Sequence, residues 1–301
     1  MELVQVSDRV FCLAGPTNIG VVVSPDGVAV LIDSGLDSTI AKRVVRDVSA
    51  RGWKVGAVIN THAHADHTGG NAEVKRRTGC EVWAPRFEEA WIREPVSEPL
   101  ALFAGARPPS GLLSKFTLAE ACQVDHILEP GEVEVCGIVM RVESLKGHSP
   151  NQMGIAAGGV LFCGDAFFQP DQLSKHVIPY NVDIGSHLET LHRLLEVPAA
   201  VVVPGHGGVC DDPKGVVEAN LERVRRIEEC VLDAAGGGAT SEDIVSRVCS
   251  RMGVTPGSVA LYYLMASAIH AYLSHLESEG RLRVEITDVR PVWGRDGVET
   301  G

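Results

Sequence analysis

The sequence predicts an α/β fold with a smaller unit attached at its C-terminal end. Short apolar segments rich in valine, isoleucine and alanine alternate with segments of helical periodicity, which is typical of an α/β domain. Several of these apolar segments are followed directly by histidine or aspartate. Three consecutive glycines at 236–238 then separate residues 240–301 from the rest. The chain of 301 residues is long enough for two ordinary domains.

Strands and helices are predicted first between residues 21 and 84. Two strands, at 21–23 and 28–32, flank a turn that contains Pro25 and Gly27. The next apolar residues recur every four positions, which indicates a helix that begins near Asp37 or Ser38 and ends before Gly52. Further strands are expected at 55–59 and 80–84, with a helix between them that begins after Asn71.

Residues 85–125 differ in character, because five prolines interrupt their apolar and aromatic residues. That density rules out a central strand and allows only short helices. We therefore predict a helical insertion beside the core. Two roles stay open: a surface excursion that packs its own aromatic residues, or a lid in which Trp91 and Phe103 line a substrate pocket.

The pattern of strands resumes after the insertion, at 134–142, 160–163 and 199–203. A helix precedes the last of these strands, and Ser186 and Glu189 have the spacing of a capping box at its start. A charged amphipathic helix is expected over 214–235.

Residues 240–301 are predicted to form a small separate unit. One helix covers about 241–252, another begins at Thr255-Pro256 and ends before Gly280, and two short strands follow. This order resembles a winged-helix module. The unit carries eight acidic and six basic residues, so DNA reading is disfavoured, and packing onto the core or homodimerisation is expected instead.

Composition excludes several classes of protein. No stretch reaches the roughly 18 apolar residues of a membrane-spanning helix, and the N-terminus lacks the pattern of a secretory signal. The net charge of −12 makes sequence-independent nucleic-acid binding unfavourable. The eight cysteines contain no CxxC pair, and without a secretory signal we expect reduced thiols and a cytoplasmic protein. Since nucleic acid is disfavoured, we expect a small-molecule substrate.

The most informative segment is His62-Ala63-His64-Ala65-Asp66-His67, which follows an apolar strand and precedes two glycines. Its spacing differs from HExxH, where the two histidines share a helix face. Here His62 and His64 can point to one side of an extended segment, while Asp66 and His67 follow as the chain turns. This geometry can supply two adjacent metal ions.

Three further candidate ligands have similar neighbours in the sequence. His148, Asp165 and His206 each lie just past an apolar segment, next to glycine or proline residues that let the backbone turn sharply. A single histidine of this kind is weak evidence for a site. Together with the first motif, the three predict one shared metal centre.

These segments together resemble the metallo-β-lactamase superfamily, in the binuclear metal-dependent hydrolase branch that includes glyoxalase II-like and lactonase-like enzymes. The motifs follow the family's order from Asp33 to His206, about two thirds of the chain. The resemblance implies a four-layer αββα sandwich of two mixed sheets, with residues 1–235 as the catalytic domain. Residues 240–301 resemble the winged-helix-like module of two-domain, β-lactamase-like members.

The resemblance also implies a ligand set. One metal ion would be held by His62, His64 and His148 and a second by Asp66, His67 and His206, with Asp165 as the bridge. Asp33 matches the first family motif, in which the residue lies behind the ligands and steadies their loop.

The chemistry of these seven residues agrees with the resemblance. Nitrogen and oxygen ligands without a thiolate suit Zn²⁺, and Fe or Mn would also fit. Two cations roughly 3.5–4 Å apart can bring the pKa of a shared water close to neutrality, so that a bridging hydroxide attacks the substrate. Asp66 can orient this hydroxide and relay its proton. We expect a hydrolase of a small ester, thioester or lactone.

Other functions remain open. The C-terminal module resembles that of β-lactamase-like endoribonucleases, so a phosphodiesterase is one alternative, although the charge opposes it. A persulfide dioxygenase, with one iron held by two histidines and one aspartate, is another. A flavodiiron protein and a binding protein without catalysis fit the motifs less well.

Several residues near these motifs have no assigned role. In lactonase-type relatives a tyrosine near the bridging aspartate binds the acyl oxygen, and Tyr180 lies 15 residues after Asp165. His176 and Cys210 also lie near the motifs in sequence. Four other histidines occupy predicted helices and are expected to be structural or solvated: His187, His192, His270 and His275.

Overall fold

Two mixed β-sheets form the centre of the molecule, whose computed structural model describes residues 2–295. The first sheet has the order β1-β2-β3-β4-β5-β6-β7, and the second β12-β11-β10-β9-β8. The strands of the first sheet are β1 (Leu3–Ser7), β2 (Val10–Leu13), β3 (Ile19–Val23), β4 (Val28–Ile32), β5 (Lys54–Ile59), β6 (Glu81–Pro85) and β7 (His126–Leu128). Those of the second are β8 (Gly131–Val135), β9 (Ile138–Ser144), β10 (Met153–Ala157), β11 (Val160–Gly164) and β12 (Val201–Pro204).

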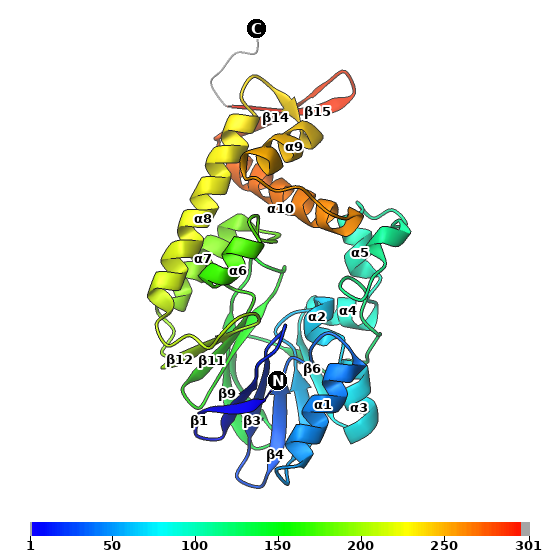
Figure 1. Cartoon of the computed structure of the whole chain (residues 1–301), viewed down its shortest axis with the longest axis vertical. Coiled ribbons are helices and arrows are strands. Elements are labelled where there is room, and N and C mark those ends of the chain that lie inside the picture. The colour runs from blue at the N-terminus through cyan, green and yellow to red at the C-terminus, as the bar shows by residue number, and fades with distance from the viewer. Residues whose placement is uncertain (1, 296–301) are drawn as a thin grey trace.

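Three apolar clusters separate four layers, which confirms the predicted αββα sandwich. One cluster joins the first sheet to helices α1 (Ser38–Ser49) and α3 (Asn71–Thr78). A second lies between the two sheets, and a third joins the second sheet to α7 (Ile184–Leu194) and α8 (Pro213–Ala234). Figure 1 shows α1 and α3 on one outer side of the sheets, with α7 and α8 next to the other sheet.

The loops that carry the candidate residues meet at one edge of this sandwich. Strands β4 and β5 run parallel, as do β11 and β12. Asp33, His62, Asp165 and His206 each follow the carboxyl end of one of these four strands. Since the carboxyl ends of parallel strands lie at the same edge of their sheet, the sequence brings these side chains together.

The predicted insertion leaves the first sheet between β6 and β7. It contains only the short helices α4 (Glu88–Arg93) and α5 (Ser97–Leu102) and the 3₁₀ turn η1 (Ser110–Leu112), as its prolines require. Helix α5 and η1 contact α10 (Val259–Ser278) of the C-terminal unit. In Figure 1 the end of α10 lies beside α5.

The C-terminal unit contains α9 (Ser241–Arg251), α10 and a three-stranded sheet. Its strands are β13 (Ala239–Thr240), β14 (Leu282–Thr287) and β15 (Arg290–Arg295). The sequence predicts only two of these strands. The third, β13, has just two residues and is defined by its pairing with β15, which is distant in sequence. The unit's last six residues lie outside the described residues. No helix within residues 2–295 is long and apolar enough to cross a membrane.

One predicted strand is wrong. The segment 134–142 is not continuous but forms the β8–β9 hairpin, with Val135 paired to Ile138. Cys136 and Gly137, at the turn, have positive φ angles of 54° and 74°. Both central residues of this kind of two-residue hairpin turn need a positive φ angle, which glycine, asparagine and aspartate adopt most readily. Because the first of them is a cysteine, the sequence does not indicate the turn. Strand β10, which pairs with β9, was not expected either.

Two predicted helix starts are also wrong. Asp183 is the N-cap of α7, and its carboxylate accepts hydrogen bonds from the Ser186 amide and hydroxyl. Ser186 is therefore inside the first turn and caps nothing. Helix α10 begins at Val259, where the Ser258 side chain accepts from the Leu261 amide, so Thr255-Pro256 precedes the helix.

Candidate metal centre

The motif at 62–67 runs from the end of β5 into α2 (Ala65–Thr68), a single helical turn. His62 and His64 lie on the extended part, and Asp66 and His67 on the helix. The turn fits against the loop after β4 because two glycines follow it. A Cβ atom on Gly69 would clash with the Leu36 carbonyl oxygen, so a larger residue would displace the ligand loop.

All seven predicted residues come together in the structure. They form three overlapping groups, each with its candidate ligand atoms within 4.8 Å of one another. The groups are His62, His64 and His148; His62, His67 and Asp165; and Asp66, His67 and His206.

Asp165 lies between the histidines of these groups. Its Oδ1 atom is 3.3 Å from His67 Nε2, and its Oδ2 atom is 3.3 Å from His206 Nε2 and 3.6 Å from His148 Nε2. A Cβ atom on Gly205 would clash with Asp165 Oδ1, so only glycine fits immediately before His206.

Oxygen atoms behind the site fix the orientation of the imidazole rings. Asp33 accepts hydrogen bonds from the Thr61 amide and hydroxyl, at 2.8 and 2.9 Å, and its Oδ2 atom also lies 2.8 Å from His67 Nδ1. Because the Thr61 hydroxyl donates to Asp33, its oxygen can accept from His62 Nδ1, 3.0 Å away. Both histidines then turn Nε2 towards the site with a free lone pair when neutral.

The remaining histidines follow the same arrangement, with one exception. His148 Nδ1 donates to the Tyr180 carbonyl at 2.8 Å, and His206 Nδ1 donates to the Pro16 carbonyl at 2.5 Å. His64 instead turns its Nδ1 atom inward, 2.9 Å from His148 Nε2. Two ring nitrogens that point at one place are expected of two ligands of the same cation.

The electrostatics of the site divide these histidines into two kinds. Burial, with repulsion between neighbouring histidines, holds the pKa of His62 well below its usual range and lowers that of His64 to about 3. Burial lowers the pKa of His148 as well. At His67 and His206 burial would also lower the pKa, but the aspartates outweigh it. Asp165 and its neighbours raise the pKa of His67 to about 10 and that of His206 to about 12.

Several buried atoms of the site lack a hydrogen-bond partner within residues 2–295, and a bound cation would satisfy them. Among the described residues, His62 Nε2, His67 Nε2 and Asp165 Oδ1 are fully buried and have no hydrogen-bond partner. Such atoms are costly in a folded protein unless something else satisfies them. Five imidazoles and two carboxylates form a donor set that suits a divalent transition metal.

Glu88 is the main residue at this site that the sequence analysis missed. It comes from α4 in the insertion and is 1% exposed. Its carboxylate accepts from the Ala63 amide at 3.1 Å, the Ser149 hydroxyl at 2.6 Å and the Asn151 amide at 2.9 Å. It therefore ties the loop of His62 and His64 to the loop of His148. No spacing in the sequence relates it to either loop.

Two buried amides hold the other loops. Asn18 donates to the carbonyls of Pro204 and Gly207, at 2.8 Å each, on both sides of His206. Gln152 accepts from the Asp165 amide at 3.1 Å. Neither belongs to a recognisable motif, and the partners of Asn18 are distant in sequence.

The family model described as the metallo-beta-lactamase superfamily matches residues 13–206, which include every candidate ligand. The chain belongs to the metallo-β-lactamase superfamily.

Two of its curated relatives support this assignment. A hydroxyacylglutathione hydrolase of Rhodospirillum rubrum is 45% identical over 173 residues, which cover 56% of this chain and 54% of the relative. A beta-lactamase-like protein 2 homolog of Drosophila melanogaster is 27% identical over 153 residues, 49% of each protein. The chain spans about half the length of these relatives.

Solved structures of the superfamily share the fold along almost the whole chain. A metallo-beta-lactamase family protein of Thermus thermophilus aligns with a TM-score of 0.75 at 20% identity, over 97% of this chain and 100% of that one. A beta-lactamase domain protein of Burkholderia ambifaria aligns with a TM-score of 0.76 at 20% identity, over 97% and 93%. Both alignments therefore include the C-terminal unit.

The residues without an assigned role lie in different places around this superfamily site. The ring of Tyr180 lies 5.5 Å from that of His64, edge to face. His176 is exposed near Phe168, and Cys210 pairs through its backbone with Val202. Of the four helical histidines, His187 is buried, His275 is half-buried, and His192 and His270 are exposed.

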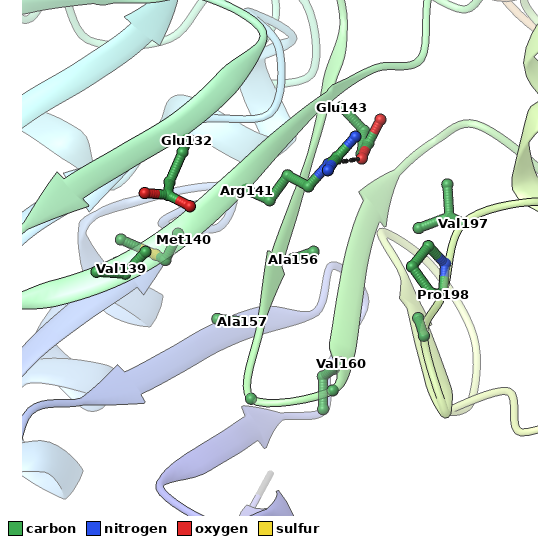
Figure 2. A pocket seen from close by; sticks show the side chains of 13 residues that line it. Glu132, Val139, Met140, Arg141, Glu143, Ala156, Ala157, Val160, Val197 and Pro198 are labelled. Carbon is green, nitrogen blue, oxygen red and sulfur yellow. Dashed lines mark hydrogen bonds and ion pairs between the residues drawn. The ribbon is translucent and has the colours of Figure 1, made fainter.

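A separate hollow, of about 260 Å³, lies at the other end of β11 and β12 (Figure 2). It is lined by residues of β8 and β9, by the end of β10, the β10–β11 turn and the start of β11, and by residues 197–199. Two of its three charged residues, Arg141 and Glu143, form an ion pair, and Glu143 also contacts Arg193. The superfamily site is at the opposite ends of these strands, so this hollow takes no part in it.

Proposed function

We propose that this protein is a metal-dependent hydrolase of a small thioester, with esters and lactones as related substrates. The observation that carries the proposal is the convergence of seven ligand-type side chains with buried, unpartnered atoms at one edge of a superfamily fold. The thioester is placed first because the curated relatives include hydroxyacylglutathione hydrolases.

The ligand groups support two adjacent metal positions. His62, His64 and His148 would hold one ion, Asp66, His67 and His206 the other, and Asp165 lies where it can contact both. Zn²⁺ fits this donor set best. When bound, such a pair supplies an activated water, as a bridging hydroxide, and a Lewis acid for the substrate oxygen.

Asp66 is the residue that we assign to catalysis. Its side chain is 28% exposed and that of His206 22%, whereas His62 and His67 are buried, so the site opens to solvent on the Asp66 side. Asp66 Oδ2 lies 3.1 Å from His206 Nε2 and accepts from the Thr17 hydroxyl at 3.3 Å. This carboxylate is placed to orient the attacking water and to take its proton.

We also infer that the enzyme works in a reducing compartment such as the cytoplasm. All eight cysteines are free thiols, and six of them are buried. Burial raises the pKa of several of these thiols, Cys12 and Cys122 to about 11, so that they stay protonated and unreactive.

The first experiment measures metal content and hydrolysis on the same preparation. We expect about two Zn²⁺ per chain and turnover of a hydroxyacyl thioester of glutathione, lost on chelation and restored by Zn²⁺. A chelated, metal-free protein with unchanged turnover would contradict the proposal. One ion per chain, or turnover of a phosphodiester alone, would favour the alternative functions.

The second experiment tests Asp66. Asp66→Ala should lower kcat by about 10²–10⁴-fold or more, because it removes a proton-transfer group that would also hold the second ion. His192→Ala, at an exposed histidine on α7, is the control and should keep its turnover. Equal turnover of the two variants would remove Asp66 from the reaction.

A further inference from the structure

A larger cavity, of about 560 Å³, lies between the insertion and the C-terminal unit. One wall comes from the end of α5 and the residues after it, and the other from α9 and one face of α10. The lining residues are Ala101, Leu102, Phe103, Ala104, Ala106, Glu242, Val245, Tyr262, Tyr263, Ala266, Ser267 and His270. Its volume falls within the range of roughly 300–1,000 Å³ that small-molecule pockets occupy.

The walls of this cavity are mainly apolar. The ring of Phe103 packs edge to face on that of Tyr263, with centroids 5.2 Å apart, and joins the insertion to α10. Leu102, Val245 and Ala266 are buried, and the alanines leave the space open. Such a surface favours a hydrocarbon chain or ring over a charged group.

Two side chains, those of Ser267 and Tyr180, lie between the cavity and the candidate metal centre. Ser267 lines the cavity and lies beside the side chain of Tyr180. The Tyr180 ring packs against His64, and the Tyr180 carbonyl accepts from His148. A substrate whose reactive carbonyl is near His64 could therefore extend past Tyr180 towards Ser267.

We propose that this cavity is the subsite for the apolar part of the substrate, a hydrocarbon chain or ring attached to the group that is hydrolysed. This rests on the proposed hydrolase function and adds the substrate class, an acyl compound with a sizeable apolar group. Phe103, Tyr263 and Ala266 determine how large that group can be.

Two variants change the cavity in opposite ways. Ala266→Leu fills it from the α10 side, and Phe103→Ala removes one wall. Phe116→Ala is the matched control, since Phe116 belongs to the same insertion, is 62% exposed and does not line the cavity. Metal content and thermal stability are measured on all three, so that a folding defect is recognised.

The kinetic test compares S-acetyl and S-octanoyl thioesters of one thiol. The wild-type protein should have the larger kcat/KM for the octanoyl thioester. Ala266→Leu and Phe103→Ala should each lower the octanoyl-to-acetyl ratio of kcat/KM by about tenfold or more, as expected for lost apolar contacts. Phe116→Ala should keep the wild-type ratio. The subsite is contradicted if all four proteins share one ratio.

A binding test separates failure of this proposal from failure of the proposed function. The probe is the non-hydrolysable octyl thioether of the same thiol, titrated into the metal-free protein by calorimetry. We expect binding by the wild type and Phe116→Ala, and binding weakened about tenfold in Ala266→Leu. Binding without turnover of any thioester, ester or lactone would retain the cavity as a site and reject the hydrolase. Turnover without binding of the thioether would reject the subsite alone.

Discussion

At the scale of single residues, the candidate ligands depend on neighbours that never touch the site. Glu88 Oε1 accepts from Ser149 and Asn151, and Oε2 accepts from Ala63. The Ala63 amide lies between the two histidines that begin the motif, so one carboxylate holds the backbone of two ligand loops. Partners behind metal ligands often matter to metal affinity by about 10–100-fold.

We predict that Glu88→Gln weakens metal binding by about 10–100-fold. If the amide oxygen keeps its contacts with Ser149 and Asn151, the new NH₂ group faces the Ala63 N–H. Two donors then meet, and the loop of His62 and His64 shifts. Metal affinity, measured by competition with a chelator, checks the prediction.

Glu94→Gln is the control for this variant, because Glu94 follows α4 and is exposed. Its metal affinity should match that of the wild type. If Glu88→Gln lowers the melting temperature but binds metal normally, Glu88 supports the fold and not the ligand loops.

The residues that were predictable from sequence differ physically from those that were not. His62 to His67 form a local motif, and His148, Asp165 and His206 each follow an apolar segment, so sequence spacing alone indicates them. Glu88 and Asn18 act through partners that are distant in sequence, and Gln152 acts across neighbouring strands without a motif. Asn18 and Pro204, for example, are 186 positions apart. Such contacts depend on the finished packing of both sheets.

At the scale of elements, α7 places one histidine in the core and one in solvent. His187 is 2% exposed, and its Nδ1 atom has no hydrogen-bond partner among the described residues. Burial, with a smaller effect of His148, lowers its pKa to about 3. In the unfolded chain the pKa would be near 6.5. Below that pH the unfolded state binds a proton that the folded state does not, so stability falls as the pH falls.

We predict that this histidine removes about 2 kcal/mol of stability between pH 6.5 and pH 5, from 1.36 kcal/mol per pH unit. His187→Leu cannot be protonated, so its free energy of unfolding should fall less steeply over this range. Urea unfolding at both pH values gives the difference. His192→Leu, on the exposed side of α7, should keep the wild-type dependence of the free energy of unfolding on pH. If this free energy falls as steeply in His187→Leu as in the wild type, His187 is protonated in the folded protein and the prediction is wrong.

Elements were predictable where their signals are local. The helix capped by Asp37 and the short helices of the insertion follow from capping residues and prolines. The β8–β9 hairpin was missed because Cys136 takes a positive φ angle that glycine or asparagine usually adopts. Strand β13 was missed because two residues carry no periodicity, and only pairing with β15 defines it.

At the scale of the whole molecule, the C-terminal unit shares its core with helices of the αββα sandwich. One cluster contains Ile184 of α7 and Ile227 of α8 together with Ile244 of α9 and with Ile269 and Tyr272 of α10. On the other side, α5 and η1 of the insertion contact α10. The glycines at 236–238 therefore mark a turn in the chain but not a break in the apolar packing.

This shared core predicts that the protein unfolds in one transition, because neither part can open without exposing apolar residues of the other. Ile269→Ala, at a fully buried position of α10, should destabilise the whole molecule by about 2–5 kcal/mol. Ile286→Ala, on β14 where the side chain is 74% exposed, should change stability by less than about 0.5 kcal/mol. Calorimetry of the metal-loaded protein should show one peak that moves as a unit in Ile269→Ala. Two peaks, of which only one moves, would mean that the C-terminal unit folds independently of the metal-binding part.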